Sequence, residues 1–339
     1  MTKLKMNLGK NSYEIFVGKG LIKTLDKYFN LNRKVLIVTD SGVPEEYSKA
    51  VAKRCKQSKI YVLPKGEKSK NLNNLTKLYQ VACDFNLERS DCVVAVGGGV
   101  VGDISGLMAG TYMRGIDFYN LPTTLLSQVD SSIGGKTAVD FNSVKNLIGV
   151  FNQPKAVVVD TSTLSTLPKR QIFNGMVEAV KMSATCDKEL FKTFEESSVE
   201  QIMENIDDIV VRSLKIKKSV VEKDEKESGL RRVLNFGHTY GHCIEALLSK
   251  KGVLHGECVA LGMLPMSGKK VKPRIEKVLQ KFDLIKDYEF DVDEALEYLS
   301  KDKKVANGKI NCVYVEEIGE FKMLNLTQSK FWDLIKKSI

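Results

Sequence analysis

The chain has 339 residues, a hydrophobic fraction of 43% and a formal net charge of +10, which indicates a globular protein large enough for two domains and excludes a disordered chain. It contains no signal-peptide pattern, no apolar run of about 18 residues and no C-x-x-C pair among its seven cysteines, so we expect a cytosolic protein with reduced thiols. Lysines are spread along the chain among acidic residues, which is typical of a solvated surface and predicts neither a membrane nor a nucleic-acid partner.

Five β-rich runs lie in the first 170 residues, at 34–40, 59–70, 91–103, 117–124 and 156–160. Most are continuous apolar runs, which indicate strands buried on both faces of a parallel sheet. The sequence after residue 170 is dominated by long amphipathic helical patterns, and a small hairpin at 309–326 precedes a last helix capped by Thr327. We therefore predict an α/β domain at 1–168 and a mainly helical domain at 169–339.

A glycine-rich loop follows the third of these runs. Gly97, Gly99 and Gly102 have the G-x-G-x-x-G spacing between a predicted strand and a predicted helix, where backbone N–H groups and the helix N-terminus can hold a pyrophosphate. A tight turn without a ligand is the alternative. The carboxylate expected about 20 residues downstream is missing, and Asp40 ends an earlier strand instead, so a nucleotide site here departs from the usual dinucleotide order.

All three histidines of the chain lie within 18 residues of one another. Two or three imidazoles and one carboxylate form the ligand set of a catalytic zinc, and Glu178 is a candidate carboxylate. By spacing alone, His238 and His242 would be the metal pair, because residues four apart share one face of a helix. Taken singly, each histidine is more often a hydrogen-bonded structural residue, but the clustering with His255 favours a site.

Several motifs together closely resemble the 3-dehydroquinate synthase family of sugar-phosphate cyclases. They run in the family order from about residue 34 to residue 320 and include "GEKSK", "GGGVVGD", "YMRG", "LPTTLLSQVDSSIGGKTAVD", "KNLIGVF", "GMVEAVK", "LRRVLNFGHTYGH" and "HGECVALGM". The resemblance implies a Rossmann-like NAD-binding N-terminal domain, a helical metal- and substrate-binding C-terminal domain and an active site in the cleft between them. It also implies a lyase of the shikimate pathway, and thus of aromatic amino acid biosynthesis, that forms 3-dehydroquinate and phosphate from 3-deoxy-arabino-heptulosonate 7-phosphate.

The resemblance also implies a role for each site residue. The ligands of a divalent metal, zinc or cobalt, become Glu178, His238 and His255, while His242 moves to the substrate side, contrary to the interpretation from spacing. Residues for the substrate are Asp130, Lys136, Asn146, Lys181, Lys217, Arg231, Asn235, His242, Lys303 and, from the neighbouring subunit of a homodimer, Arg114. Residues for NAD are Asp40, Glu67, Lys70, Gly98, Gly99, Gly102, Asp103, Thr123, Thr124, Lys136, Lys145, Thr163 and Thr166.

The sequence leaves two other enzymes open. One is another cyclase, such as 2-deoxy-scyllo-inosose synthase, which uses glucose 6-phosphate, and the other is a metal-dependent polyol dehydrogenase, which would release NADH. The presence of Lys217, Arg231, Asn235 and His242 favours the dehydroquinate reaction, because a substrate with a carboxylate calls for that cationic cluster. An NAD-sensing relic or a nucleic-acid binder is disfavoured, since no inferred site residue is lost and no basic helix is present. One departure from the family is the short segment after Met263, which puts local helix packing beside His255 in doubt.

Overall fold

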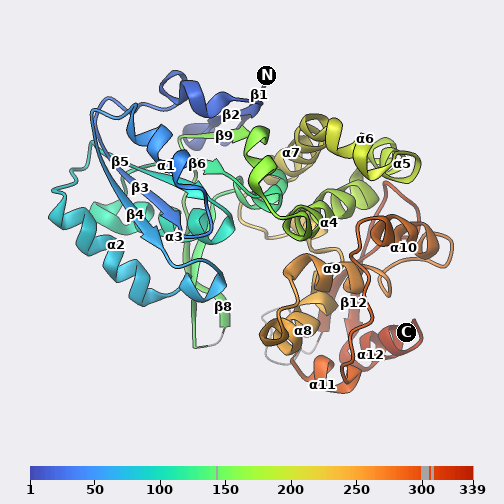
Figure 1. Ribbon diagram of the computed structural model, residues 1–339. Helices are drawn as coiled ribbons and strands as arrows, with labels where there is room; N and C mark the ends of the chain where they lie inside the picture. Colours follow the sequence, from blue (N-terminus) through green and yellow to red (C-terminus); the bar gives the residue numbers. More distant parts are fainter. Residues whose placement is uncertain (143, 299–304, 307–308, 339) are drawn as a thin grey trace. The chain divides into compact units, whose positions relative to one another are not determined.

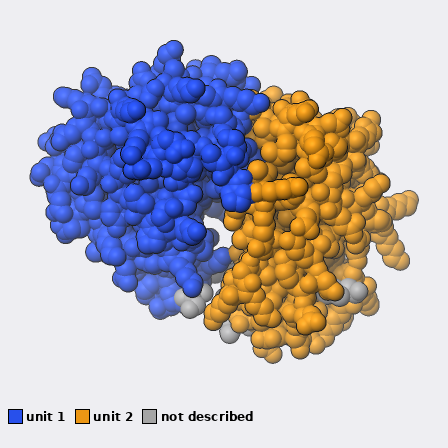
Figure 2. All heavy atoms as spheres, in the orientation of Figure 1, with its two compact units in different colours: residues 1–168 blue, residues 169–339 orange. Residues whose placement is uncertain are grey.

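The structure is a computed structural model that describes residues 1–142, 144–298, 305–306 and 309–338 (Figure 1). The chain forms two compact units, which are coloured separately in Figure 2: unit 1 is Met1–Pro168 and unit 2 is Lys169–Ile339. Among the described residues, no helix combines the length and the apolar character needed to cross a membrane. Each unit is described by itself below.

Unit 1 is built on a seven-stranded sheet in which only the β1–β2 pair is antiparallel. All five β-rich runs predicted from the sequence contribute a strand, so the predicted parallel sheet is confirmed. The two N-terminal strands were not predicted. In spatial order the strands are β1 (Thr2–Met6), β2 (Tyr13–Gly18), β9 (Ala156–Asp160), β6 (Asp117–Pro122), β5 (Cys92–Gly97), β3 (Lys34–Asp40) and β4 (Gln57–Leu63).

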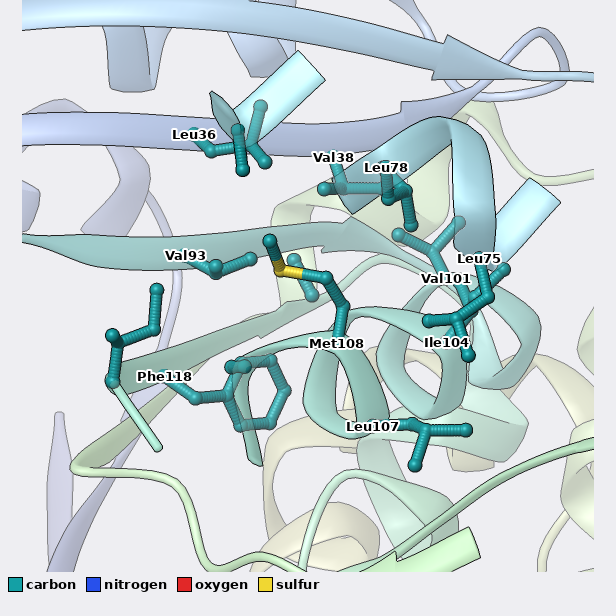
Figure 3. Close-up of a cluster of buried hydrophobic side chains, with 14 of the residues drawn as sticks. Leu36, Val38, Leu75, Leu78, Val93, Val101, Ile104, Leu107, Met108 and Phe118 are labelled. Atoms are coloured by element: carbon teal, nitrogen blue, oxygen red, sulfur yellow. The ribbon is translucent and has the colours of Figure 1, made fainter. Parts of the chain in front are cut away.

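Helices cover both faces of this sheet because its central strands are apolar on both sides. Leu36, Val38 and Val93 point to one face, where they pack with α2 (Leu72–Asp84) and α3 (Gly99–Thr111) (Figure 3). The alternate residues of the same strands pack on the other face with α1 (Glu45–Ala52) and the 3-10 segment η2 (Leu21–Lys27). A separate hairpin, β7 (Lys136–Phe141) and β8 (Val144–Phe151), and five short helical segments complete the unit: η1 (Gly9–Asn11), η3 (Glu67–Ser69), η4 (Tyr112–Arg114), η5 (Ser127–Ser131) and η6 (Thr161–Thr166).

Unit 2 is mainly helical, as predicted. Near its C-terminus β11 (Lys309–Tyr314) and β12 (Lys322–Thr327) form the expected hairpin, joined by β10 (Val305–Ala306). The side chain of Thr327 accepts the Lys330 N–H and so caps the last helix, α12 (Gln328–Lys336). The other helical elements are α4 (Lys169–Cys186), α5 (Lys188–Glu196), α6 (Val199–Glu204), α7 (Ile206–Lys223), η7 (Leu230–Asn235), α8 (His238–Leu248), η8 (Ser249–Lys251), α9 (His255–Met263), α10 (Lys272–Lys281) and α11 (Val292–Glu297).

Glycines bring three helices of unit 2 unusually close together. A Cβ on Gly262 of α9 would lie 2.0 Å from the Gly237 carbonyl oxygen, and one on Gly241 of α8 would lie 2.9 Å from the Cys258 carbonyl oxygen. On the other side of α9, a Cβ on Gly256 would lie 2.2 Å from the carbonyl oxygen of Asn174 in α4. Because only glycine avoids these clashes, α9 can lie directly against both α8 and α4.

The short segment after Met263 does not disturb this packing. It is held to the β-sheet of unit 2 by a bridge between Ser267 and Val315 and by the hydrogen bond from the Gly268 N–H to the Val315 carbonyl, 2.8 Å long. Met266 and Val271 are buried. The connection therefore leads from α9 to α10 while α9 begins at His255 and packs closely on α8 and α4.

Candidate metal and nucleotide sites

Three side chains from three helices of unit 2 meet at one buried carboxylate oxygen. Glu178 lies in the middle of α4, whereas His238 and His255 are the first residues of α8 and α9. The Nε2 atoms of His238 and His255 lie 3.7 Å and 3.6 Å from Glu178 Oε1. Glu178 is only 1% exposed, and its Oε1 has no hydrogen-bond partner.

This geometry fits a metal ion. Buried polar atoms are normally hydrogen-bonded, so a buried carboxylate oxygen without a hydrogen-bond partner, flanked by two imidazole nitrogens, fits a bound cation. Ligand atoms of a tetrahedral zinc, each about 2.0–2.2 Å from the ion, lie about 3.4 Å apart, close to the distances found here. One carboxylate and two imidazoles leave coordination positions open for a substrate, as in catalytic sites.

The far nitrogens of both imidazoles have acceptors of their own. His238 Nδ1 lies 3.1 Å from the Phe236 carbonyl oxygen, and His255 Nδ1 lies 3.0 Å from Glu245 Oε2. An Nδ1–H that donates to such an acceptor leaves the Nε2 lone pair for a metal. Sequence reasoning missed Glu245, although it follows His238 by seven residues and thus lies on the same face of α8.

The surroundings keep Glu178 ionised. Burial alone would raise the pKa of this carboxyl, but the charge of Lys181, one turn further along α4, and the His255 ring overcome it and lower the pKa to about 2. Burial would lower the pKa of His255, but the neighbouring carboxylates of Glu178 and Glu245 outweigh it and raise the pKa to about 9. The carboxylate is therefore available as an anionic ligand at neutral pH.

The third histidine lies beside the other two. The ring of His242 is centred 5.3 Å from that of His238 and 5.8 Å from that of His255. His242, Glu245 and His255 form a second group whose ligand atoms lie within 4.8 Å of one another. The assignment of His242 to the substrate, and not to the metal, therefore stays a prediction.

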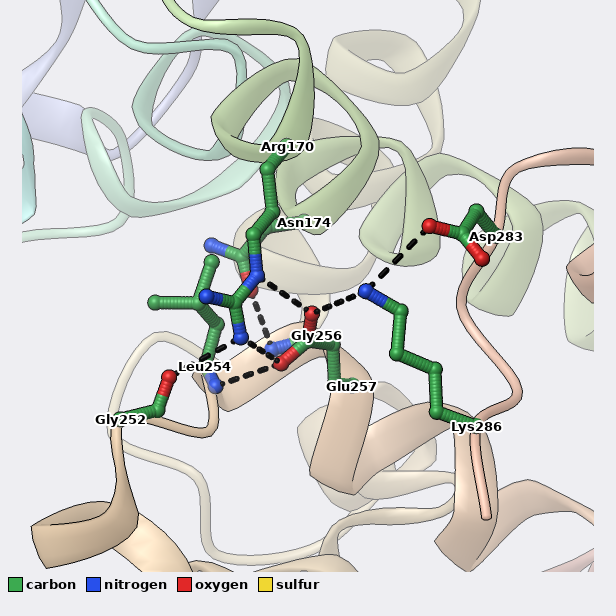
Figure 4. A network of polar contacts seen from close by, with 8 residues as sticks. All are labelled: Arg170, Asn174, Gly252, Leu254, Gly256, Glu257, Asp283 and Lys286. Atoms are coloured by element: carbon green, nitrogen blue, oxygen red, sulfur yellow. Dashed lines mark hydrogen bonds and ion pairs between the residues drawn. The ribbon is translucent and has the colours of Figure 1, made fainter. Parts of the chain in front are cut away.

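A polar network holds the first turn of α9 against α4 (Figure 4). The guanidinium of Arg170 donates two hydrogen bonds of 2.8 Å to Glu257, which also accepts the Leu254 N–H. Beside it, the Gly256 N–H donates to the side-chain oxygen of Asn174. Burial would raise the pKa of Glu257, but Arg170 and the Leu254 N–H lower it to about 2. The network thus stabilises the approach of the helix that carries His255 to the helix that carries Glu178.

The predicted substrate residues of unit 2 that the structure describes lie on η7 and on the helices α4, α7 and α8. Lys217 on α7 and Arg231 on η7 are buried cations. The backbone before Arg231 is shaped by the Asp224 carboxylate, which accepts N–H groups from Ser228, Gly229 and Arg231. Lys303 lies outside the described residues.

Glu227, which was not singled out from the sequence, contacts the predicted substrate residue Asn235. Its carboxylate accepts a 2.8 Å hydrogen bond from Asn235 Nδ2. Glu227 has a φ of 60°, so the chain turns sharply there and directs this side chain toward a residue eight positions later. A turn of this kind in a run of charged residues carries no helical or strand periodicity, which explains why sequence reasoning missed it.

The predicted cofactor residues of unit 1 follow the carboxyl ends of its parallel strands. From β3 the chain crosses to β4 on one side and then to β5 on the other, so the strand order reverses between β3 and β5. Ligands of open α/β sheets bind at such a switch point. Asp40 ends β3, and the glycine loop follows β5. Further along the edge, Thr123 and Thr124 follow β6, Thr163 and Thr166 lie in η6 after β9, and Glu67 and Lys70 follow β4.

The glycine loop leaves little room for side chains. A Cβ on Gly98 would lie 3.0 Å from Thr124 Cγ2, and one on Gly99 would lie 3.1 Å from Ser131 Oγ. Gly98 precedes α3, whose N-terminus receives no hydrogen bond from a capping side chain. Backbone N–H groups at an uncapped helix N-terminus, approached through glycine, fit a pyrophosphate. The residues present therefore fit a dinucleotide.

A buried lysine links the glycine-loop helix to the β7–β8 hairpin. Lys70 Nζ donates to Asp103 Oδ2 on α3 and to Asn146 Oδ1 on β8. Burial opposes the charge on Lys70, but Asp103 and Glu67 outweigh it and raise the pKa. Asn146, predicted for the substrate, thus contacts Lys70, a residue predicted for NAD. Among the other predicted residues of unit 1, Asp130 lies in η5, Lys136 begins β7, and Lys145 is exposed on β8.

Arg114 lies in η4, beyond the end of α3 that is remote from the glycine loop. It is exposed, and it adopts a left-handed backbone with a φ of 67°. Met113 before it is also left-handed, with a φ of 49°, and is exposed as well. The side chain is therefore accessible to a partner.

Two family models match the chain: 3-dehydroquinate synthase N-terminal over residues 60–174 and 3-dehydroquinate synthase C-terminal over residues 175–305. A 3-dehydroquinate synthase of Clostridium acetobutylicum is 42% identical over 343 aligned residues, which cover 94% of this chain and 95% of that protein. A 3-dehydroquinate synthase of Streptococcus thermophilus is 40% identical, with 94% of this chain and 95% of that protein covered.

Two solved structures of cyclases have a similar fold. A 2-deoxy-scyllo-inosose synthase complexed with carbaglucose-6-phosphate, NAD+ and Co2+ has a TM-score of 0.90 at 25% identity, with both chains fully covered. A 2-epi-5-epi-valiolone synthase from Streptomyces hygroscopicus with NAD+ and Zn2+ bound has a TM-score of 0.88 at 25% identity, with 98% of each chain covered. A probable glycerol dehydrogenase from Sinorhizobium meliloti, 16% identical with a TM-score of 0.60 over 95% of each chain, shares the fold alone.

Proposed function

Because the chain belongs to the 3-dehydroquinate synthase family, we propose that it converts 3-deoxy-arabino-heptulosonate 7-phosphate to 3-dehydroquinate and phosphate. The reaction is that of a carbon–oxygen lyase in the shikimate pathway. NAD takes part and is regenerated within each turnover. The observation in the structure that carries the proposal is the unpartnered Glu178 oxygen between the His238 and His255 nitrogens.

We assign the metal site to Glu178, His238 and His255, with zinc or cobalt as the ion. Bound there, a divalent ion would polarise a substrate hydroxyl and lower its pKa, while NAD would accept a hydride and return it. Lys181, Lys217 and Arg231 would hold the carboxylate and phosphate of the substrate, together with Asn235, Asp130, Lys136, Asn146 and Lys303. We place His242 against the substrate, where it can exchange a proton with a hydroxyl.

We assign NAD to the carboxyl edge of the unit 1 sheet. Asp40, with Glu67 and Lys70 nearby, would contact the adenosine, since a carboxylate at a strand end can accept hydrogen bonds from ribose hydroxyls. The glycine loop and Asp103 would meet the pyrophosphate. The remaining contacts would come from Thr123, Thr124, Lys136, Lys145, Thr163 and Thr166. Unit 1 would thus be the NAD-binding domain and unit 2 the metal- and substrate-binding domain.

The test is to incubate the protein with the heptulosonate phosphate, NAD and zinc, and to measure phosphate and NADH in the same sample. We expect phosphate release to exceed NADH accumulation by far, because each oxidation is reversed later in the turnover. A one-to-one yield of the two would identify a dehydrogenase. No release of phosphate by metal-loaded protein would refute the proposal.

The similarity to 2-deoxy-scyllo-inosose synthase, with a TM-score of 0.90, supports one second candidate. That enzyme class acts on glucose 6-phosphate, which has no carboxylate. Turnover of glucose 6-phosphate in preference to the heptulosonate phosphate would favour it. The buried cations Lys217 and Arg231 support the first candidate, because a carboxylate-bearing substrate makes better use of them.

We further propose a homodimer in which Arg114 acts on the neighbouring subunit's substrate. Arg114 and Met113 are exposed at the end of α3, and the adjoining hairpin exposes apolar side chains. A Cβ on Gly110 near this end of α3 would lie only 3.0 Å from Val150 of that hairpin. Clustered exposed apolar residues favour a protein interface. The exposed hairpin residues are Phe141, Val144, Val150 and Phe151.

The cytosol is the location that we propose. All seven cysteines are free, which suits a reducing compartment. NAD and sugar phosphates are charged metabolites of the cell interior, so an enzyme that uses both is expected there.

A further inference from the structure

We propose that Glu245 is a positioning residue for the metal ligand His255, which it holds by accepting the Nδ1–H so that the Nε2 lone pair faces Glu178. The inference rests on the metal site proposed above and names the group on which that site depends.

Glu245 reaches His255 because of its place on α8. His238, His242 and Glu245 are spaced i, i+4 and i+7, so they line one face of the helix. The start of α9 lies against this face, since Gly241 and Gly262 allow the two helices to come close. Glu245 Oε2 consequently lies 3.0 Å from His255 Nδ1.

The two nitrogens of His255 have different environments. Nδ1 meets the carboxylate of Glu245, whereas Nε2 lies 3.6 Å from Glu178 Oε1. A neutral imidazole carries one proton, and the nitrogen that carries it cannot bind a metal. A strong acceptor at Nδ1 keeps the proton there and also fixes the rotation of the ring. Glu245 therefore selects both the tautomer and the direction of the ligand.

His238 provides an internal comparison. Its Nδ1 lies 3.1 Å from the Phe236 carbonyl oxygen, which belongs to the backbone two residues earlier. The first ligand of α8 is thus oriented by the chain itself. The ligand of α9 has a side chain in the same role, and that side chain can be replaced by mutation.

A competing arrangement would make Glu245 a ligand itself, together with His242 and His255. In that case His255 would bind the ion through Nδ1, and Glu178 would not be needed. The two arrangements use opposite nitrogens of one ring, so each predicts a different set of variants that lose the metal.

The experiment measures metal affinity without substrate. Metal-free protein with Glu245→Leu, Glu245→Asp or Glu245→Gln is titrated with zinc in competition with a chromophoric chelator, and the visible absorption of the cobalt form is recorded. We expect Glu245→Leu to weaken binding about 10- to 100-fold, the usual effect of losing such a partner. Glu245→Gln keeps an oxygen that accepts the Nδ1–H, so it should stay closer to the wild-type affinity than Glu245→Asp, which keeps the charge but is too short.

Asp91→Asn is the matched control. Asp91 is as buried as Glu245, each being 6% exposed, but it accepts backbone N–H groups from Lys34 and Glu88 in unit 1. We expect this variant to lose stability and to bind zinc as the wild type does. If Glu245 had a merely structural role, Glu245→Leu would lose stability and keep its zinc affinity, as Asp91→Asn should. That result would overturn the inference.

Two further variants separate a failure of the inference from a failure of the proposed metal site. Glu178→Gln and His238→Ala should abolish tight binding if the site is right. Loss of the metal in these two, with wild-type affinity in every Glu245 variant, would refute the role of Glu245 alone. Tight binding in Glu178→Gln, with loss in His242→Ala and in Glu245→Gln, would refute both. If Glu245→Leu does not fold, the zinc affinities of the other two variants decide the question. The inference requires Glu245→Gln to bind zinc more tightly than Glu245→Asp.

Discussion

Removing Arg170 should expose how strongly unit 2 depends on the network at the start of α9 (Figure 4). In Arg170→Ala, the carboxylate of Glu257 keeps the Leu254 N–H and the ammonium of Lys286, whose Nζ lies 3.5 Å away. It loses two hydrogen bonds of 2.8 Å to a guanidinium. Because Glu257 is only 2% exposed, water cannot fully replace them.

The structure sets the size of the effect. Breaking a buried ion pair by removing one partner costs about 3–5 kcal/mol. Here the side chain of Arg170 is 51% exposed, so water can enter the place that it leaves, and two partners of Glu257 remain. We therefore expect Arg170→Ala to lower the free energy of unfolding by about 2–3 kcal/mol.

Adding a second substitution, Glu257→Gln, tests whether the loss of stability comes from a buried carboxylate that has lost its counter-ion. In Arg170→Ala/Glu257→Gln, the amide at position 257 still accepts the Leu254 N–H but carries no charge. If the cost comes from a buried carboxylate without its counter-ion, the double variant should be more stable than Arg170→Ala by about 1 kcal/mol. The second substitution would then restore stability although it also weakens an interaction.

Urea unfolding followed by tryptophan fluorescence measures this directly. Trp332 is the only tryptophan of the chain and lies on α12, so the signal reports unit 2. A chelator in every sample removes the contribution of bound metal. Arg274→Ala is the control, since Arg274 also makes a two-pronged contact with a carboxylate, but with Glu195, whose side chain is 25% exposed.

We expect the control to change the stability by about 0–1 kcal/mol, as for a surface ion pair. Equal losses in Arg170→Ala and Arg274→Ala would mean that burial of the carboxylate does not matter. A double variant no more stable than Arg170→Ala would equally refute the reasoning.

Four further predictions concern the site and its support. Burial would raise the pKa of Asp224, but hydrogen bonds from backbone N–H groups outweigh it and hold the pKa below its usual range. The contribution of Asp224 to stability should therefore be full above about pH 4 and be lost as the pH falls further. Urea titrations at several pH values should show a smaller loss of stability at low pH for Asp224→Asn. His242→Ala should lose turnover but still bind nearly one equivalent of zinc by metal analysis, and loss of the metal would make His242 a ligand. Gly256→Ala, whose Cβ would lie 2.2 Å from a carbonyl oxygen of α4, should cost about 1–3 kcal/mol and weaken zinc binding, whereas a more stable protein would contradict the close packing. Mixing inactive Arg114→Ala and Lys217→Ala under subunit exchange should restore up to about half of the wild-type activity if Arg114 acts across a dimer, and exchange without any return of activity would contradict this.

Much of the fold could be predicted from local patterns. The runs at 34–40 and 92–97 contain consecutive apolar residues, so both faces of each strand are apolar. Such strands are stable only when helices cover both sides of the sheet. This predicted a parallel sheet, and the helical second half was predicted from its amphipathic periodicity. The β1–β2 edge was missed because residues of Thr2–Met6 alternate between partly buried and exposed, with only Met6 buried, which is a weaker signal than a continuous apolar run.

The ends of some elements depended on single residues. The segment before His238 is a 3-10 turn and not part of α8, because Gly237 adopts a φ of 77° and separates them. His238 is therefore the first residue of its helix. Its ring still shares a face with that of His242, so the argument from spacing placed the two rings together correctly.

The sequence by itself determined which residues could form a metal site, because histidines are rare in this chain and all three lie in one short stretch. Tertiary structure decided which of them meet a carboxylate. Glu178 comes from a helix 60 residues before His238, and Glu245 meets His255 only where α8 and α9 touch. Spacing along one helix cannot reveal either contact, since both arise from the close approach of separate helices that the glycines at 241, 256 and 262 permit.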